Sequence, residues 1–236
     1  MPTLDTNATL ADLVTARPGL APQFDRLGLD YCCRGQRRLV DAVDAAGLDL
    51  DQVLDSLDSV SAEPNDEDWS AMGPAELVDH LEATHHAYLH DALGRLGALV
   101  DKVTAVHGER HPELVEVQSL FGELRADLEP HLLREERVLF PMVRELGAAT
   151  TAPSFQCGSL ANPIRVMLAE HDTAGDLLAR LRSATGDYAV PDDGCASYQA
   201  LYAGLAELEA DTHLHVHKEN NLLFPAVLNA EQTLVT

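Results

Sequence analysis

From residue 74 onward, apolar residues recur every three or four positions over long stretches of the chain. This spacing places apolar side chains on one face of an α-helix. Breaks rich in glycine and proline interrupt the pattern, and the stretches between them predict four long helices, at about 74–106, 112–144, 163–183 and 196–228. Four long helices with short or moderate connections favour an up-down-up-down bundle. The pattern therefore predicts an all-α protein.

In residues 1–62 the same spacing of apolar residues occurs over shorter stretches. It predicts four short helices, at about 8–16, 22–27, 39–46 and 50–57. A polar, acidic stretch that contains proline follows, and we expect a linker at 63–73. The predicted organisation is a small helical N-terminal domain at 1–62, the linker, and a bundle domain at 74–236.

One motif, H-x-x-x-E-x-x-x-L-F-P, occurs twice, at 131–141 and at 215–225. Residues four apart lie on the same face of a helix, so each copy can direct an imidazole and a carboxylate to one point. A single such pair is more often a surface ion pair, but two copies in the same register favour a metal site between facing helices. Pro141 and Pro225 predict a bend or an end of each helix nearby.

The other two long helices carry histidines at matching offsets. His86 precedes His131 by 45 residues, and His171 precedes His215 by 44. If Glu135 and Glu219 each bridge two metal ions, every ion receives two imidazoles and two carboxylate oxygens. Room then remains for an oxo or hydroxo bridge and one open position. Ligands of this kind favour a redox-active iron pair over tetrahedral zinc, although a zinc or purely structural bundle is a competing interpretation.

Other polar residues lie close to these six in the chain, and their positions suggest different roles for them. Glu136 has Asn220 as its counterpart in the second copy, so we interpret it as a solvated neighbour. His213 and His217 flank His215 by two residues, which turns them to the far side of the helix, either in solvent or in a supporting role. Three other histidines compete with His86 as the ligand: His80, His85 and His90. His90 lies one helical turn from His86, so it could be an extra ligand or a supporting partner.

Composition narrows the functional classes. The formal net charge of −23 argues against nucleic acid and anionic membranes as partners. An apolar fraction of 46% is that of a protein with a real core, and the sequence contains no apolar run long enough for a membrane helix. The N-terminus shows no basic region followed by an apolar core, so we expect no signal peptide and a cytoplasmic location.

Cys32 and Cys33 form the second chemical feature. Adjacent cysteines have poor geometry for a mutual disulfide, and Arg34, Arg37 and Arg38 can lower a thiol pKa. The pair is either a reactive, metal-binding or nitric-oxide-binding dithiol or part of a small core. Cys157 and Cys195 have no partner that the sequence identifies, and four cysteines are too few for a disulfide framework.

Taken together, these segments resemble a known family. Asp30-Tyr31-Cys32-Cys33, H-x-x-x-E-E-x-x-L-F-P, Glu170-His171-Asp172 and H-x-x-x-E-N-N-x-L-F-P are similar to the di-iron proteins that repair iron–sulfur clusters (the RIC family, also called YtfE/ScdA). The resemblance covers nearly the whole chain. That family joins a short N-terminal helical domain to a hemerythrin-like bundle, and it usually has glycine directly after the two cysteines, where this chain has Arg34 and then Gly35.

The resemblance implies a centre of two non-haem iron ions, oxo- or hydroxo-bridged, with six ligands: His86, His131, Glu135, His171, His215 and Glu219. It implies restoration of iron–sulfur clusters after oxidative or nitrosative stress by iron donation, with damaged iron–sulfur proteins as partners and nitric oxide and oxygen as small ligands. Cys32, Cys33 and Cys195 match family cysteines. Whether nitric oxide or peroxide chemistry occurs at the centre is left open.

Two further expectations concern the alternatives and assembly. A hemerythrin-like oxygen or nitric oxide binding or sensing protein is the alternative function, but hemerythrin-type oxygen carriers use five histidines and this chain offers four at matching positions. An N-terminal domain of about 60 residues buries little core alone, which makes a homodimer through that domain plausible.

Overall fold

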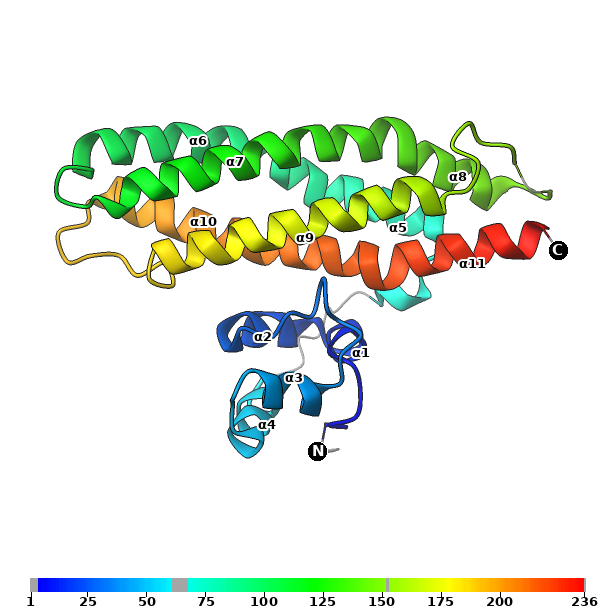
Figure 1. Cartoon of the computed structure of the whole chain (residues 1–236), viewed down its shortest axis with the longest axis horizontal. Coiled ribbons are helices and arrows are strands. Elements are labelled where there is room, and N and C mark those ends of the chain that lie inside the picture. The colour runs from blue at the N-terminus through cyan, green and yellow to red at the C-terminus, as the bar shows by residue number, and fades with distance from the viewer. Residues whose placement is uncertain (1–3, 61–67, 152, 236) are drawn as a thin grey trace.

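The computed structural model describes residues 4–60, 68–151 and 153–235. Helices dominate them, and within these ranges the only strand-like pairings are isolated bridges, Thr9 with Arg38 and Phe155 with Gly158. A long bundle carries a small helical unit on one side, near the middle of its length (Figure 1). The predicted all-α fold is confirmed.

Four long helical rods form the bundle, and three of them are interrupted by one π-helical turn. The first rod is α5 (Pro74–Leu81), the turn Glu82–His86 and α6 (Ala87–His107). The second is α7 (Glu113–Arg134), the turn Glu135–Leu139 and α8 (Phe140–Ala148). The third is α9 (Ala161–Ala184). The fourth is α10 (Ala196–Lys218), the turn Glu219–Leu223 and α11 (Phe224–Val235).

The prolines of the two L-F-P segments do not end their helices. Each is the second residue of the helix after a π-turn, α8 or α11. The N–H groups of Phe140 and Phe224 reach back five residues, to the carbonyls of Glu135 and Glu219. The next residue, proline, has no N–H, so the hydrogen-bond ladder can return to α-helical spacing there. The widened turns thus begin at the two repeated glutamates.

Neighbouring rods pack in a closed square, since α6 contacts α7 and α10, and α9 also contacts α7 and α10. Two apolar clusters fill the bundle. One lies among α6, α7, α9 and α10 and includes Leu96, Phe121 and Tyr202. The other joins α5, α8 and α11 to the start of α9 and includes Phe140 and Phe224. Buried polar side chains interrupt the apolar interior between these clusters.

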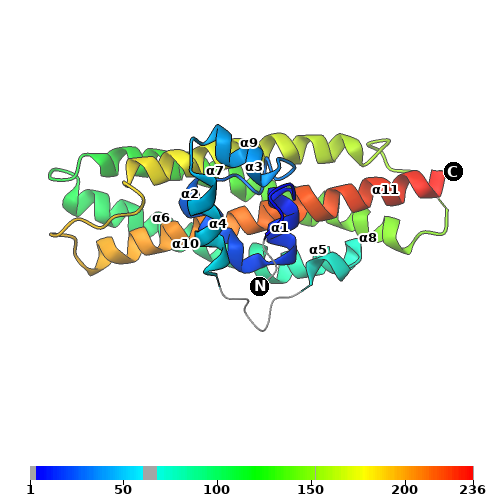
Figure 2. The ribbon, with the colours of Figure 1, turned by 90° about the horizontal axis from the view of Figure 1, so that it is seen from below.

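Four short helices build the N-terminal unit: α1 (Leu10–Ala16), α2 (Ala21–Leu27), α3 (Leu39–Ala45) and α4 (Leu50–Asp58). Its apolar core includes Val216 of α10, with Leu214 packed against it. A unit this small buries little apolar surface alone, and the bundle of its own chain completes the core. Figure 2 shows it crossing the bundle over α10. The first five residues of the predicted linker, 63–67, lie outside the described residues.

Candidate metal centre

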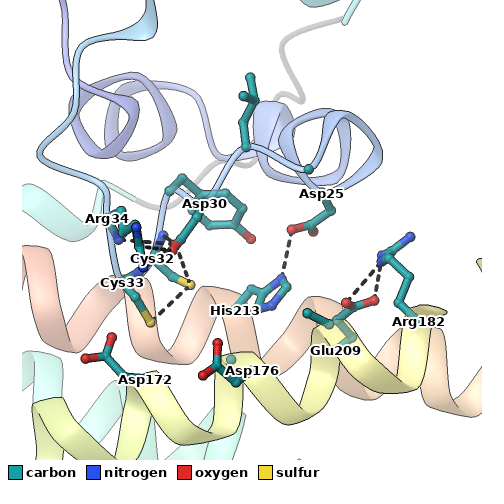
Figure 3. Close-up of a pocket in the computed structure, with 15 residues that line it drawn as sticks. Asp25, Asp30, Cys32, Cys33, Arg34, Asp172, Asp176, Arg182, Glu209 and His213 are labelled. Atoms are coloured by element: carbon teal, nitrogen blue, oxygen red, sulfur yellow. Dashed lines mark hydrogen bonds and ion pairs between the residues drawn. The ribbon is translucent and has the colours of Figure 1, made fainter. Parts of the chain in front are cut away.

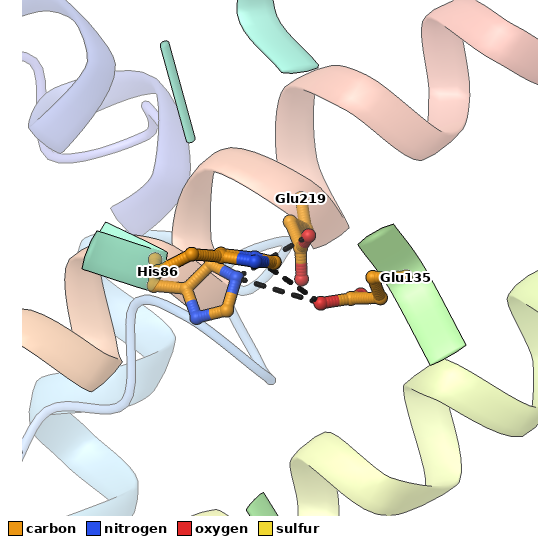
Figure 4. A group of neighbouring side chains, drawn as sticks. His86, Glu135 and Glu219 are labelled. Carbon is orange, nitrogen blue, oxygen red and sulfur yellow. Dashed lines mark ion pairs between the residues drawn. The ribbon is translucent and has the colours of Figure 1, made fainter. Parts of the chain in front are cut away.

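Six buried side chains converge where three π-turns meet α7, α9 and α10. His131, His171 and His215 come from these α-helices, whereas His86, Glu135 and Glu219 come from the turns. Each is at most 2% exposed. Figure 4 shows His86 directed toward Glu135 and Glu219. All six residues selected from the repeat and its offsets are therefore brought together by the fold.

The six residues form two groups that share both carboxylates. His86 and His215 belong to one group and His131 and His171 to the other, and in each group one ligand atom per residue lies within 4.8 Å of all the others. Glu135 Oε2 is 3.4 Å from His86 Nε2 and 3.3 Å from His131 Nε2. Glu219 is 3.1 Å from His171 Nε2 and 3.3 Å from His215 Nε2. Both carboxylates can thus bridge two cations.

Unsatisfied atoms show that this cluster fits metal ions. All four carboxylate oxygens of Glu135 and Glu219 are buried and accept no hydrogen bond. Nε2 of His86 and of His215 is likewise without a hydrogen-bond partner. Buried polar atoms are normally paired, and buried charges are normally paired or bound to a metal. Cations between the carboxylates would satisfy all of these atoms, and imidazole with carboxylate suits iron, manganese or zinc.

Electrostatics in the cluster favour positive charge. Burial opposes the protonated form of His131, yet the Glu135 carboxylate raises the pKa of this imidazole to about 9. Burial also opposes ionisation of Glu219, but His215 and His171 hold the pKa of its carboxyl well below the usual value. The carboxylates therefore stay ionised and attract protons or metal cations.

Glu136 is not a solvated neighbour. Its Oε1 accepts hydrogen bonds from His86 Nδ1, at 3.0 Å, and from His90 Nε2, at 2.7 Å. Glu136 lies in the same π-turn as Glu135, directly after it in the chain. His90 thus supports His86 through Glu136 and is not an extra ligand. Such partners orient a histidine and raise its basicity as a ligand.

Two further supporting residues were not selected from the sequence. Glu170 Oε2 accepts from His131 Nδ1 at 2.8 Å, and Asn220 Oδ1 accepts from His171 Nδ1 at 2.7 Å. Both follow or precede one of the six residues directly in the chain. That adjacency is the signal that could have identified them, but the pairings themselves run between helices.

The remaining competitors of His86 belong to a separate polar cluster. His85 Nδ1 donates to Asp211 at 2.8 Å, and the Lys218 ammonium donates to Nε2 of His85 and of His80, at 2.8 and 2.7 Å. Lys218 also lies 4.1 Å from the centre of the Trp69 ring. Neither His80 nor His85 belongs to the groups that could hold a metal ion.

The cysteine pair sits on a tight turn that Asp30 organises. Asp30 Oδ1 accepts from the backbone N–H groups of Cys32, Cys33 and Arg34, at 3.2, 2.9 and 3.2 Å. The two sulfurs are 3.8 Å apart and both thiols are free. The hydrogen bond to Cys33, together with burial, raises the pKa of Cys32 well above its ordinary value.

The expectation that nearby arginines lower this thiol pKa is therefore wrong. Arg38 turns away and pairs with Asp41, at 2.7 Å. Arg34 lies 3.9 Å from Asp30, whose carboxylate itself disfavours a thiolate at Cys32. Adjacency in sequence did not bring the positive charge to the sulfur.

A cavity of about 550 Å³ separates the cysteine turn from α9 and α10 (Figure 3). Asp30, Cys32 and Cys33 line one wall, and Asp172 and Asp176 of α9 line the other. Beside the cavity, Asn221 Nδ2 donates to the Cys32 carbonyl at 3.0 Å, and Asn220 Nδ2 reaches the same oxygen at 3.3 Å. Asn220 thus connects the cysteine turn to His171.

His213 and His217 face the N-terminal unit, so a solvated position is wrong for both. His213 Nδ1 donates to Asp25 at 2.8 Å, and His217 lies 3.2 Å from the Thr15 hydroxyl.

At the far end of the bundle, Cys195 Sγ lies 3.2 Å from His107 Nε2, a partner that the sequence did not reveal.

Comparisons with known proteins agree with this architecture. A hemerythrin HHE cation-binding domain model matches residues 77–227, and a domain of unknown function called ScdA_N matches residues 6–61. No helix in the described ranges has both the length and the apolarity needed to cross a membrane.

Curated relatives match over almost their full length. A probable iron–sulfur cluster repair protein of Haemophilus influenzae is 36% identical over 93% of this chain and 96% of its own. The iron–sulfur cluster repair protein YtfE of Cronobacter sakazakii is 33% identical over 94% of this chain and 97% of its own. YtfE of an Escherichia coli strain is 31% identical with the same coverage.

Proposed function

Because this chain belongs to the family of hemerythrin-like iron–sulfur cluster repair proteins, we propose that it holds two iron ions and donates iron to damaged iron–sulfur clusters. The ligands in this proposal are His86 and His215 for one ion, His131 and His171 for the other, and both carboxylates shared between them. Damaged iron–sulfur proteins are the partners.

One observation carries the proposal. Two fully buried carboxylates, Glu135 and Glu219, have four oxygens without hydrogen bonds, and each faces histidines of both groups. A purely structural bundle would have to balance these buried charges with protonated histidines while the carboxylate oxygens accept no hydrogen bond, at a cost in free energy. The arrangement supports a pair of bridged cations.

The chemistry of the donor set supports iron that can leave. Bound iron would supply a change of oxidation state. Hard anionic ligands hold Fe(II) less tightly than Fe(III), so Fe(II) is the form that would leave more easily. The protein supplies the ligands and the groups that orient them. Glu135 and Glu219 would neutralise charge on the ions, and outer partners hold three of the histidines, His86, His131 and His171. Closed tetrahedral zinc would use four ligands per ion, but it would offer no change of oxidation state.

Iron transfer can be tested directly. The protein is loaded with labelled iron and mixed with an enzyme whose [4Fe–4S] cluster has been damaged by oxidant, and both the label in the enzyme and its activity are measured. We expect the wild type to restore activity and His131→Ala and Glu219→Ala to fail. His111→Ala is the matched control, because His111 pairs with Asp193 and Glu113 outside the centre. Full repair by the two site variants would refute the proposal.

Metal analysis separates the other functions. About two iron ions per chain with visible absorption are expected. A colourless protein with zinc alone would refute an iron centre. Stable, reversible binding of oxygen or nitric oxide without any release of iron to the damaged enzyme would instead indicate a carrier or sensor.

A further inference from the structure

The four histidines of the centre are not equally supported. Nδ1 of His86, His131 and His171 each has a hydrogen-bond acceptor, whereas Nδ1 of His215 is buried and has no partner. We propose that the position formed by His86 and His215 binds its metal ion more weakly and is the one that gives up iron. This inference rests on the proposed function and adds which of the two ions is donated.

The shared ligands cannot create this difference. Glu135 and Glu219 belong to both groups, so each position has the same two carboxylates and two imidazoles. All six side chains are equally buried, at 0–2% exposure. What differs between the positions is the set of groups that hold the imidazoles.

The position of His131 and His171 has complete support. Glu170 accepts from His131, and Asn220 accepts from His171. Glu170 is itself held by the Arg134 guanidinium. An acceptor on Nδ1 fixes the tautomer that leaves Nε2 free for the metal, and it also fixes the ring orientation.

The position of His86 and His215 has half of this support. His86 donates to Glu136, but His215 donates to no group. His215 Nε2 is the atom that faces Glu135 and Glu219, at 3.8 and 3.3 Å. When Nε2 binds a metal, the proton of the neutral ring must sit on Nδ1, where it becomes a buried donor without an acceptor. Such a donor disfavours the metal-bound state.

The pseudo-repeat shows which residue stands where an acceptor for His215 would be expected. Glu170 precedes His171 and supports His131, so its counterpart, the residue before His86, should support His215. That residue is His85. It does lie beside His215, but the two rings are stacked, with centres 5.7 Å apart and planes 13° apart.

Stacked rings cannot hydrogen-bond to each other, because their N–H groups lie in parallel planes. Both nitrogens of His85 are also engaged elsewhere, with Asp211 and Lys218. The chain therefore has an imidazole face where the other half of the bundle has a carboxylate. Loss of one such outer partner typically changes metal affinity about 10–100-fold.

The inference is tested by the kinetics of iron loss from the full-length protein. The protein carrying two Fe(II) per chain is mixed, without oxygen, with a chelator that colours on binding Fe(II). We expect two phases of equal amplitude whose rates differ about 10–100-fold. Loss of both ions in a single phase from the wild type would overturn the proposal.

Variants assign the fast phase to its position. His85→Glu places a carboxylate beside His215, as Glu170 stands beside His131, and is expected to slow the fast phase toward the slow one. His85→Gln offers a neutral acceptor of similar size and keeps the test decisive if the glutamate does not fold. Glu170→Ala is the matched variant and should accelerate only the slow phase. If the His85 variants change only the slow phase, or neither phase, the assignment is wrong.

These outcomes are independent of cluster repair. Two-phase release without any transfer to a damaged enzyme would refute the proposed function and leave the inequality standing. Transfer of both ions at one rate would support the proposed function and overturn the inequality.

Discussion

The two halves of the bundle, residues 74–148 and 161–235, agree at the centre and differ around it. Each half offers a lone histidine and an H-x-x-x-E pair, and these residues converge on one site with two shared carboxylates. The outer partners differ, with Glu136 against Asn220 and His85 against Glu170. The atoms that would touch metal keep the repeat, whereas the groups that tune them do not.

The two halves of the bundle also differ in their contacts with the N-terminal unit. The N-terminal unit packs on the second half, through Val216 of α10 in its core and through Asn221 of the following π-turn, which contacts the cysteine turn. Asn220, which lies in the same π-turn as Asn221, both accepts a hydrogen bond from His171 and contacts the Cys32 carbonyl. The second half therefore couples the centre to the cysteine pair.

The largest expected effect tests the agreement between the halves. Glu135→Ala and Glu219→Ala should each abolish binding of both metal ions, because either substitution removes a ligand from both positions. Metal content after purification and dialysis measures this. Binding of one ion by either variant would show that the carboxylates are not shared, and Glu123→Ala on the surface of α7 is the control.

Asn220→Ala tests the coupling in the second half. Loss of the acceptor on His171 should weaken metal binding about 10–100-fold at the position of His131 and His171. The slow phase of iron release should accelerate while the fast phase stays unchanged. Asn221→Ala is the control, because Asn221 contacts the cysteine turn but no histidine of the six.

Gly35→Ala tests the attachment of the N-terminal unit. A β-carbon at Gly35 would lie 2.3 Å from the Tyr31 carbonyl oxygen, 2.9 Å from Ala11 Cβ and 3.0 Å from Asn221 Oδ1. Such crowding should lower the free energy of unfolding by about 1–3 kcal/mol, measured by denaturant titration. Gly94→Ala in α6 meets no atom within 4 Å and should stabilise the helix by up to about 1 kcal/mol. Equal stability of the two variants would contradict the close approach.

The smallest effect is expected at the two prolines after the π-turns. Pro141→Ala and Pro225→Ala should each lower the free energy of unfolding by about 0.4–1 kcal/mol, because the unfolded chain gains conformational freedom. Paired denaturation curves measure both variants. A clear difference between them would show that the two turns are not equivalent.

Local periodicity explains why so much was predictable. The helices and the i,i+4 pairs follow from the repeat of a single helix, and the offsets of 45 and 44 residues reflect a duplicated helical hairpin, so the fold class and the six converging residues were accessible from the sequence. The assignment of those six as metal ligands stays a prediction that the experiments above test.

Errors arose where contacts cross between elements. The sequence predicts a solvated Glu136 and a thiol pKa lowered by the arginines after Cys33. Packing instead directs Glu136 toward His86, and the Cys32 thiol donates a hydrogen bond to Cys33 and lies close to Asp30. Sequence proximity does not determine which way a side chain points once helices pack.

The sequence by itself determined the all-α fold, through the period of its helices, and the set of histidines and glutamates that meet, through a motif repeated at matching offsets. Only the tertiary structure decided which acceptor each histidine found, that His85 stacks on His215 instead of supporting it, and that the cysteine turn rests on the second half of the bundle. These depend on the rotation and spacing of helices distant in the chain, which no local pattern specifies.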